Sequence, residues 1–99
     1  MSTFKEQGNA AFKAKDFNTA VTHYSAAIEQ TPTDHTIYGN RSAANYSLNK
    51  YTEALADAEK CIELKPDWSK GYQRKAMALQ ATGKLQESIE TYQLGVDKD

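Results

Sequence analysis

The fold is decided by two stretches, FNTAVTHYSAAIEQTP at residues 17–32 and YTEALADAEKCIELKP at residues 51–66, which superimpose at a spacing of 34 residues. A third copy, LQESIETYQLGV, begins at Leu85. Small residues fill the same places in all three copies, first as Ala20, Ala54 and Ser88 and then as Ala27, Cys61 and Gly95. Small residues at matching points let neighbouring helices approach closely. A fixed period of this length predicts an array of structural repeats.

Each repeat is expected to contain two antiparallel helices, an A helix followed by a B helix. Pro32 and Pro66 end the first two B helices, because proline cannot continue a helix. Thr3 and Glu6 have the spacing of a capping box at the start of the first A helix. No stretch alternates between apolar and polar residues with period two, as a strand would. The predicted fold class is therefore all-α, with six antiparallel helices.

The expected helix bounds follow from these signals and from the turn residues between them. The A helices cover about 3–14 and 35–48, and the third is capped by Asp67 and followed by a turn at Gly83. The first B helix ends at about Thr31, the second runs from about Thr52 to Leu64, and the third runs from about Gln86 toward Val96. The residues expected to be buried between the helices are Ala20, Tyr24, Ala27, Ile28, Ala54, Leu55, Cys61 and Ile62.

The composition sets limits on the class of protein. Its 99 residues, 39% hydrophobic and 25% charged, indicate one soluble domain. No apolar run approaches the ~20 residues of a membrane span, and the N-terminus lacks a signal-peptide core, so a cytoplasmic location is expected. His23 and His35 are separate and Cys61 occupies a small packing position, so neither a metal-ligand set nor a catalytic set is predicted. We therefore expect no enzyme, no metal and no cofactor.

The period, the small-residue sites and the two prolines resemble the tetratricopeptide repeat, in three units of about 1–34, 35–68 and 69–99. The resemblance implies a right-handed superhelix whose A helices line a concave groove. The extra helix that usually covers the last repeat in this family is lacking. Ile89, Tyr92 and Val96 are therefore expected to be partly exposed and to allow contact with another copy. The chain is expected to be the N-terminal domain of a longer protein.

Charge is distributed unequally between the two kinds of helix. The A helices hold six cations and one acid, and the B helices hold two cations and eight acids. A cationic groove with an anionic back is predicted, which suits an acidic ligand. The net charge of -1 argues against nonspecific nucleic-acid binding. The A helices also lack the basic and aromatic interleaving of a strand-binding channel.

Five polar side chains on the A helices form the predicted site: Lys5, Asn9, Asn40, Lys70 and Arg74. Lys70 and Arg74 lie one turn apart and share a helix face. No acidic residue stands three or four places from Lys5 or from Arg74. Lysine supplies a point charge, asparagine amides donate with fixed geometry, and arginine can grip a carboxylate with two parallel hydrogen bonds. This combination suits a terminal carboxylate with a second acidic group beside it.

These five residues match, position by position, the dicarboxylate clamp of chaperone-binding tetratricopeptide domains, which hold the C-terminal Glu-Glu-Val-Asp of heat shock proteins 70 and 90. The surrounding stretches GNAAF (8–12), YGNRSA (38–43) and WSKGY (68–72) are most similar to the first such domain of the Hsp70/Hsp90-organising cochaperones, which prefers heat shock protein 70. The resemblance implies a non-catalytic co-chaperone adaptor. Many relatives carry serine where this chain has Gly39. Glycine weakens the second A helix by up to ~1 kcal/mol.

Two alternatives stay open at this point. The first is a repeat domain of another cochaperone, of the immunophilin or phosphatase type, which prefers heat shock protein 90. Phe12, Ala43 and Ser47, expected in the groove beside the clamp, are the residues that would discriminate between the two chaperones. The second alternative is a structural scaffold without clamp function, which explains the packing residues but not the five clamp residues together.

Overall fold

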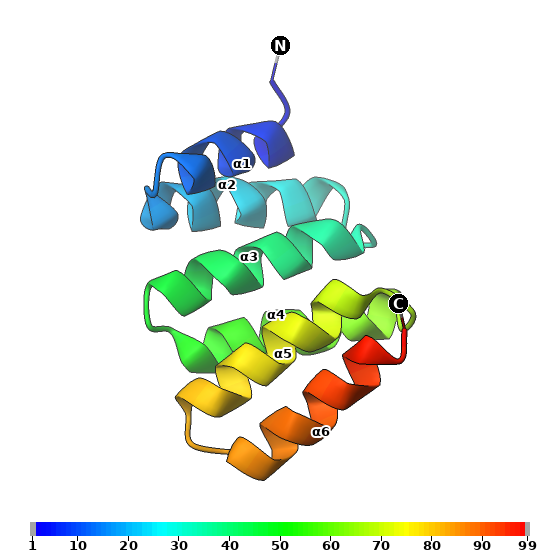
Figure 1. Cartoon of the computed structure of the whole chain (residues 1–99). Coiled ribbons are helices and arrows are strands. Elements are labelled where there is room, and N and C mark those ends of the chain that lie inside the picture. The colour runs from blue at the N-terminus through cyan, green and yellow to red at the C-terminus, as the bar shows by residue number, and fades with distance from the viewer. Residues whose placement is uncertain (1, 99) are drawn as a thin grey trace.

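Each repeat folds into a pair of antiparallel helices, as the period predicts. The computed structural model describes residues 2–98, and these contain six α-helices and no strand (Figure 1). None of the six is long and apolar enough to cross a membrane. The helices are α1 (Phe4–Lys13), α2 (Phe17–Gln30), α3 (His35–Ser47), α4 (Tyr51–Leu64), α5 (Ser69–Ala81) and α6 (Leu85–Val96). The predicted ends differ from these by one or two residues in most helices.

The helix starts show which capping signals were interpreted correctly. The capping box is confirmed, because Thr3 Oγ1 accepts from the Glu6 N–H at 3.1 Å and Glu6 Oε1 accepts from the Thr3 N–H at 2.9 Å. The predicted cap at Asp67 is wrong. Trp68 is the residue before α5 and makes no side-chain cap, while Asp67 pairs with Lys65 at 3.5 Å.

One turn residue in each repeat adopts the left-handed conformation, and the three lie 34 residues apart. They are Lys15 (φ 64°), Asn49 (φ 63°) and Gly83 (φ 82°), each in the turn between the two helices of a repeat. Glycine adopts this conformation without steric cost, and asparagine tolerates it better than lysine does. The same turn geometry therefore recurs with three different residues, which is why the sequence signal is plain only at Gly83.

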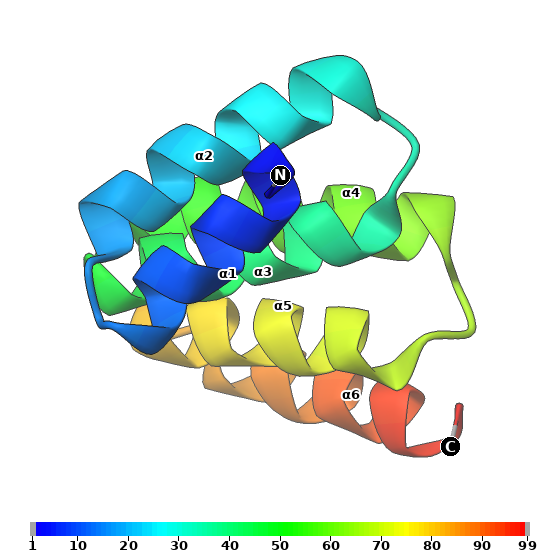
Figure 2. The ribbon, with the colours of Figure 1, turned by 90° about the horizontal axis from the view of Figure 1, so that it is seen from above.

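The helices form a curved stack with an inner and an outer layer. Figure 1 shows them stacked in chain order, and Figure 2 shows α2 lying to one side of α1 and α3. Within the described residues α1 contacts α3 and α3 contacts α5, whereas α2 makes no contact with α4, nor α4 with α6. Helices that touch across repeats must lie on the inside of the curve. The odd-numbered helices therefore line the concave face, as expected.

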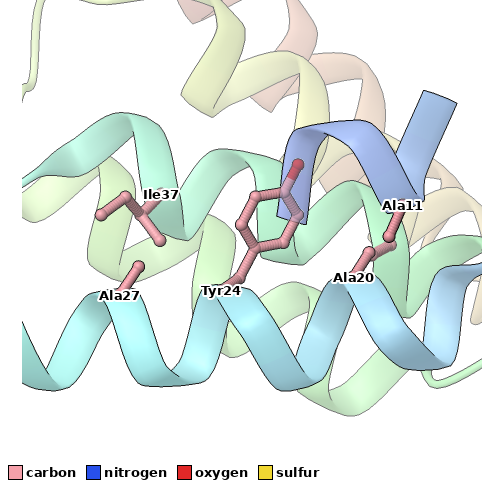
Figure 3. Packing of buried hydrophobic residues seen from close by; sticks show 6 residues of the cluster. Ala11, Ala20, Tyr24, Ala27 and Ile37 are labelled. Carbon is pink, nitrogen blue, oxygen red and sulfur yellow. The ribbon is translucent and has the colours of Figure 1, made fainter. Parts of the chain in front are cut away.

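The core lies between the two layers and is built largely from small residues. Ala20, Tyr24, Ala27, Ala54 and Cys61 are buried, as predicted. Figure 3 shows Ala20, Tyr24 and Ala27 of α2 packed against α1 and α3. The other three predicted core residues, Ile28, Leu55 and Ile62, are only half-buried. A stack only two helices deep has little interior, so small residues occupy the closest contacts and longer ones lie at the edges.

The last helix is left uncovered, as the sequence predicted. Ile89 is 63% exposed, Tyr92 57% and Val96 46%. A hollow of about 660 Å³ opens between α5 and α6, and Met77, Leu85, Ile89 and Tyr92 line it. This hollow contains none of the predicted site residues. It is the open end of the stack.

Candidate functional site

The inner layer carries two adjoining hollows that together form one groove, here called the inner groove. The first hollow, of about 180 Å³, is lined by Asn9, Phe12, Tyr24, Asn40, Ala43 and Arg74. The second, of about 210 Å³, is lined by Phe12, Ser42, Ala43, Tyr46, Ser47, Arg74 and Met77. Helices α1, α3 and α5 all contribute to it. The structure thus brings together six of the eight residues predicted for the site and its surroundings.

Asn9 is held in one orientation by hydrogen bonds to its oxygen. Tyr24 Oη donates to Asn9 Oδ1 at 2.6 Å, and Asn40 Nδ2 donates to the same oxygen at 3.2 Å. Burial raises the pKa of Tyr24 to about 12, so its hydroxyl keeps its proton at neutral pH. With its oxygen occupied twice, Asn9 has its Nδ2 group left as a donor. The pair of amides therefore offers N–H groups to an acceptor.

Gly8 explains how Tyr24 reaches α1. A Cβ atom at position 8 would lie 2.6 Å from the Tyr24 ring, so no larger residue fits there without moving the ring. Figure 3 shows the Tyr24 hydroxyl pointing toward α1 from below. Sequence reasoning placed Tyr24 in the core and missed its contact with Asn9. The signal that could have found it is the glycine directly before Asn9.

Arg74 brings a charge into the groove without a carboxylate beside it. Its side chain is half-buried, and none of the ion pairs within residues 2–98 includes it. Burial lowers the pKa of its guanidinium, which still stays charged at neutral pH. Burial also raises the pKa of the nearby Cys61 thiol to about 11, so Cys61 is neutral and does not balance the charge. Arg74 is therefore available to an acidic group from outside.

The two lysines of the predicted site lie next to the groove rather than in its hollows. Lys5 stands one turn before Asn9 on α1, and Lys70 stands one turn before Arg74 on α5. Figure 1 shows α1 and α5 running in the same direction, so both lysines lie at the same end of the groove. Lys70 is exposed, and its Nζ lies 5.9 Å from the centre of the Trp68 ring.

Lys5 already has an acidic partner, which sequence reasoning missed. Its Nζ donates to Asp34 Oδ2 at 3.2 Å. The two residues are 29 positions apart, so the search for acids along the same helix could not find the pair. Asp34 comes directly before α3 and caps it.

Arg41 and Lys75 lie on A helices and were expected in the groove, but both side chains point away from it. Arg41 faces α4, where its Nη2 and Nε donate to the two carboxylate oxygens of Asp57 at 2.7 and 3.0 Å. Lys75 pairs with Glu59 of α4 at 3.7 Å. Asp57 is itself buried, so it does not belong to an anionic back. The sorting of charge by helix is therefore wrong for Arg41, Lys75 and Asp57.

Gly39 has a packing role that its place on an inner helix did not indicate. It is buried, and a Cβ atom there would lie 3.1 Å from the Trp68 ring and 3.5 Å from Cys61 Sγ. The Trp68 ring in turn packs edge-on against the His35 ring, with 4.8 Å between the two ring centres. A serine at position 39 would need the Trp68 ring to shift by a few tenths of an ångström. Gly39 thus acts on the junction of α3, α4 and α5 rather than on the hollows of the groove.

Helix pairs that recur every 34 residues and curve around an inner groove define a helical-repeat protein. A family model described as "Serine/threonine-protein kinase BSK1-like, TPR repeats" matches residues 1–81, and one described as "Tetratricopeptide repeat" matches residues 69–97. The chain belongs to the tetratricopeptide repeat family.

A curated relative and solved structures of TPR domains are similar to this chain. The chain is 50% identical over 96 residues to the protein STIP1 homolog of Dictyostelium discoideum, covering 97% of this chain and 17% of the relative. It resembles the TPR2B domain of yeast Sti1 in complex with an Hsp70 peptide, with a TM-score of 0.94 and 34% identity. The match covers 97% of this chain and 77% of the Sti1 domain. It also resembles the first TPR domain of Spaghetti (RPAP3) bound to the HSP90 peptide SRMEEVD, with a TM-score of 0.94 and 27% identity. This match covers 97% of this chain and 76% of the RPAP3 domain.

Proposed function

We propose that this chain is a peptide-binding module that holds the C-terminal Glu-Glu-Val-Asp of heat shock protein 70. The observation that carries the proposal is Arg74, a half-buried cation without a carboxylate partner in the described chain, in the same hollow as the amides of Asn9 and Asn40. A buried charge is costly unless it is paired. An acidic ligand that enters the groove would supply the missing partner.

The five site residues have distinct roles in this proposal. Lys5, Asn9, Asn40 and Lys70 hold the terminal carboxylate, because a carboxylate accepts about four hydrogen bonds and these residues offer donors at one end of the groove. Arg74 holds an acidic side chain upstream, since its planar guanidinium can make two parallel hydrogen bonds. Phe12, Ala43 and Ser47 line the groove beyond Arg74 and contact earlier residues of the peptide.

The comparisons support a chaperone peptide as the ligand. The chain resembles domains whose structures were solved with an Hsp70 peptide and with an HSP90 peptide, and its curated relative is a STIP1 homolog. The chain spans only 17% of that relative's length, so in this proposal it acts as one domain of a longer co-chaperone adaptor. Its three units are about 1–34, 35–68 and 69–99. The preference for heat shock protein 70 rests on the resemblance of the sequence around the clamp.

Calorimetric titration of single variants with an Hsp70 C-terminal peptide tests the proposal. Lys70→Ala and Arg74→Ala should each weaken binding at least about tenfold, or ~1.4 kcal/mol, with little change in melting temperature. Lys60→Ala is the control, because Lys60 lies on the outer helix α4 and pairs with Glu63 at 3.5 Å. The proposal fails if Lys60→Ala weakens binding as much as Lys70→Ala does.

Parallel titration with the two chaperone peptides tests the preference. The proposal expects the heat shock protein 70 peptide to bind more tightly than the heat shock protein 90 peptide. Both end in the same acidic motif, so a difference must come from contacts outside the clamp, and Phe12, Ala43 and Ser47 line the groove there. Tighter binding of the heat shock protein 90 peptide would favour the alternative, a domain of the immunophilin or phosphatase cochaperone type.

A further inference from the structure

Asp34 is held rigidly beside Lys5 by the start of α3. Its Oδ1 accepts from the Thr36 N–H at 3.0 Å and from Thr36 Oγ1 at 2.6 Å, and its Oδ2 accepts from Lys5 Nζ at 3.2 Å. The two bonds from Thr36 fix the carboxylate, whereas Lys5 carries its ammonium on a flexible stem. The acid is therefore the stationary partner of the pair, and the lysine is the mobile one.

The charge of Asp34 persists at neutral pH. Burial alone would raise its pKa, but the hydrogen bonds from Thr36 and Lys5 and the charge of Lys5 lower the pKa below its ordinary value. The side chains of Lys5 and Asp34 are 37% and 25% exposed, so a ligand can reach the pair. A peptide carboxylate that approaches Lys5 would then meet a second, fixed carboxylate within bonding distance of the same ammonium group.

We propose that Asp34 sets the affinity of the groove by competing with the peptide's terminal carboxylate for Lys5. The inference rests on the proposed function, because it needs Lys5 to be a ligand of that carboxylate. Before the peptide binds, Asp34 neutralises Lys5, one of the cations near the groove. During binding, Lys5 must share its donors or leave Asp34, and the two carboxylates repel one another.

The alternative role for Asp34 is to position Lys5 for the ligand. The two roles predict opposite effects when the charge is removed. Asp34→Asn separates them cleanly, since asparagine caps a helix as well as aspartate does and can keep the hydrogen bond from the Thr36 N–H. The variant thus removes the charge of Asp34 while retaining its size and its cap.

The chain offers a matched control in the next repeat. Asp67 follows Pro66 in the corresponding loop, pairs with Lys65 at 3.5 Å, and has a mostly exposed side chain. Asp67→Asn removes the same unit of charge without touching a residue of the predicted site. Any general effect of net charge on an acidic peptide should therefore appear equally in both variants.

The experiment is a titration of both variants with the free-acid Hsp70 peptide at low and high salt. Asp34→Asn should bind about two- to fivefold more tightly than the unmodified chain, the effect expected from losing a partly exposed ion pair. Asp67→Asn should stay within about 1.5-fold. The gain should shrink at high salt and fall below about twofold when Lys5→Ala is combined with Asp34→Asn.

Three outcomes would overturn the inference. Unchanged binding in Asp34→Asn would mean that there is no competition, and weaker binding would mean that Asp34 positions Lys5. An equal gain in Asp67→Asn would reduce the effect to net charge. The Lys70→Ala variant is titrated alongside, since its loss of binding reports on the clamp itself. If Lys70→Ala binds normally, the proposed function has failed; if it loses binding while Asp34→Asn is unchanged, only the present inference has failed.

Discussion

The hydroxyl of Tyr24 on α2 donates a 2.6 Å hydrogen bond to Asn9 Oδ1 on α1, and this bond links the packing of the first repeat to the inner groove. Asn9 lies at the surface of the groove, while Tyr24 is almost fully buried. The orientation of a surface amide therefore depends on a core residue.

Replacing Tyr24 by phenylalanine should weaken peptide binding without unfolding the domain. In Tyr24→Phe, Asn9 Oδ1 keeps only Asn40 as a donor, so the amide is free to rotate and binding should weaken about two- to tenfold. Tyr72→Phe is the control, because it removes a 2.6 Å bond to the Pro66 carbonyl and Tyr72 does not line the inner groove. Calorimetry on both variants distinguishes the two sites. Equal losses of affinity would show that the Asn9 contact has no special role.

Arg41 should matter for stability rather than for binding. Its guanidinium makes two hydrogen bonds to Asp57, whose side chain is only 8% exposed. Among the described residues, Arg41→Met leaves the buried carboxylate with Asn45 as its one donor, and it should cost about 3 kcal/mol of unfolding free energy. Lys75→Met, which breaks a longer and more exposed pair with Glu59, should cost under about 1 kcal/mol. Denaturant unfolding measures both, and similar losses would contradict this ranking.

The repeat register can be tested by filling the closest helix contacts. Ala20 and Ala54 are fully buried and occupy equivalent positions in the first two repeats. Ala20→Leu and Ala54→Leu should each overpack the contact between an A helix and a B helix and destabilise the domain by ~1 to 3 kcal/mol. Thermal or denaturant unfolding provides the measurement. A loss near zero at both positions would count against the register.

The uncovered face of α6 should promote self-association at high concentration. Leu85, Ile89 and Tyr92 line the hollow between α5 and α6 and are each more than half exposed. Sedimentation over a range of concentrations should show a growing associated fraction that Ile89→Glu removes. Gln86→Glu adds the same charge on the same helix without touching the hollow, and should leave association unchanged. A strict monomer at every concentration would contradict the prediction.

The sequence predicts the fold well because the signals that determine it are local and repeated. Prolines end helices, and small residues mark close contacts wherever they recur, so the helix count and the register follow from spacing alone. The start of α5 was placed wrongly because Asp67 has the chemistry of a cap but pairs with Lys65 instead. The burial of Ile28 and Leu55 was overestimated because spacing gives the face of a helix, not the depth of the layer above it.

The position of three predicted site residues follows from the same repeat geometry. Asn9, Asn40 and Arg74 come together because the repeat places all A helices on one side of the stack. A helix assignment does not say which way a side chain on its flank turns, so Arg41 was assigned to the groove although it pairs with Asp57 on α4. The contact between Lys5 and Asp34 joins a helix to a distant loop and has no signature in the sequence.

Titration with a free-acid peptide and with the same peptide amidated at its C-terminus tests the central claim most directly. If Lys5, Asn9, Asn40 and Lys70 hold a terminal carboxylate, the free acid should bind at about micromolar affinity. Amidation removes the charge and leaves the donors poorly matched, so it should weaken binding by about 3 kcal/mol, more than a hundredfold. Equal binding of the amidated peptide and the free acid would contradict the account.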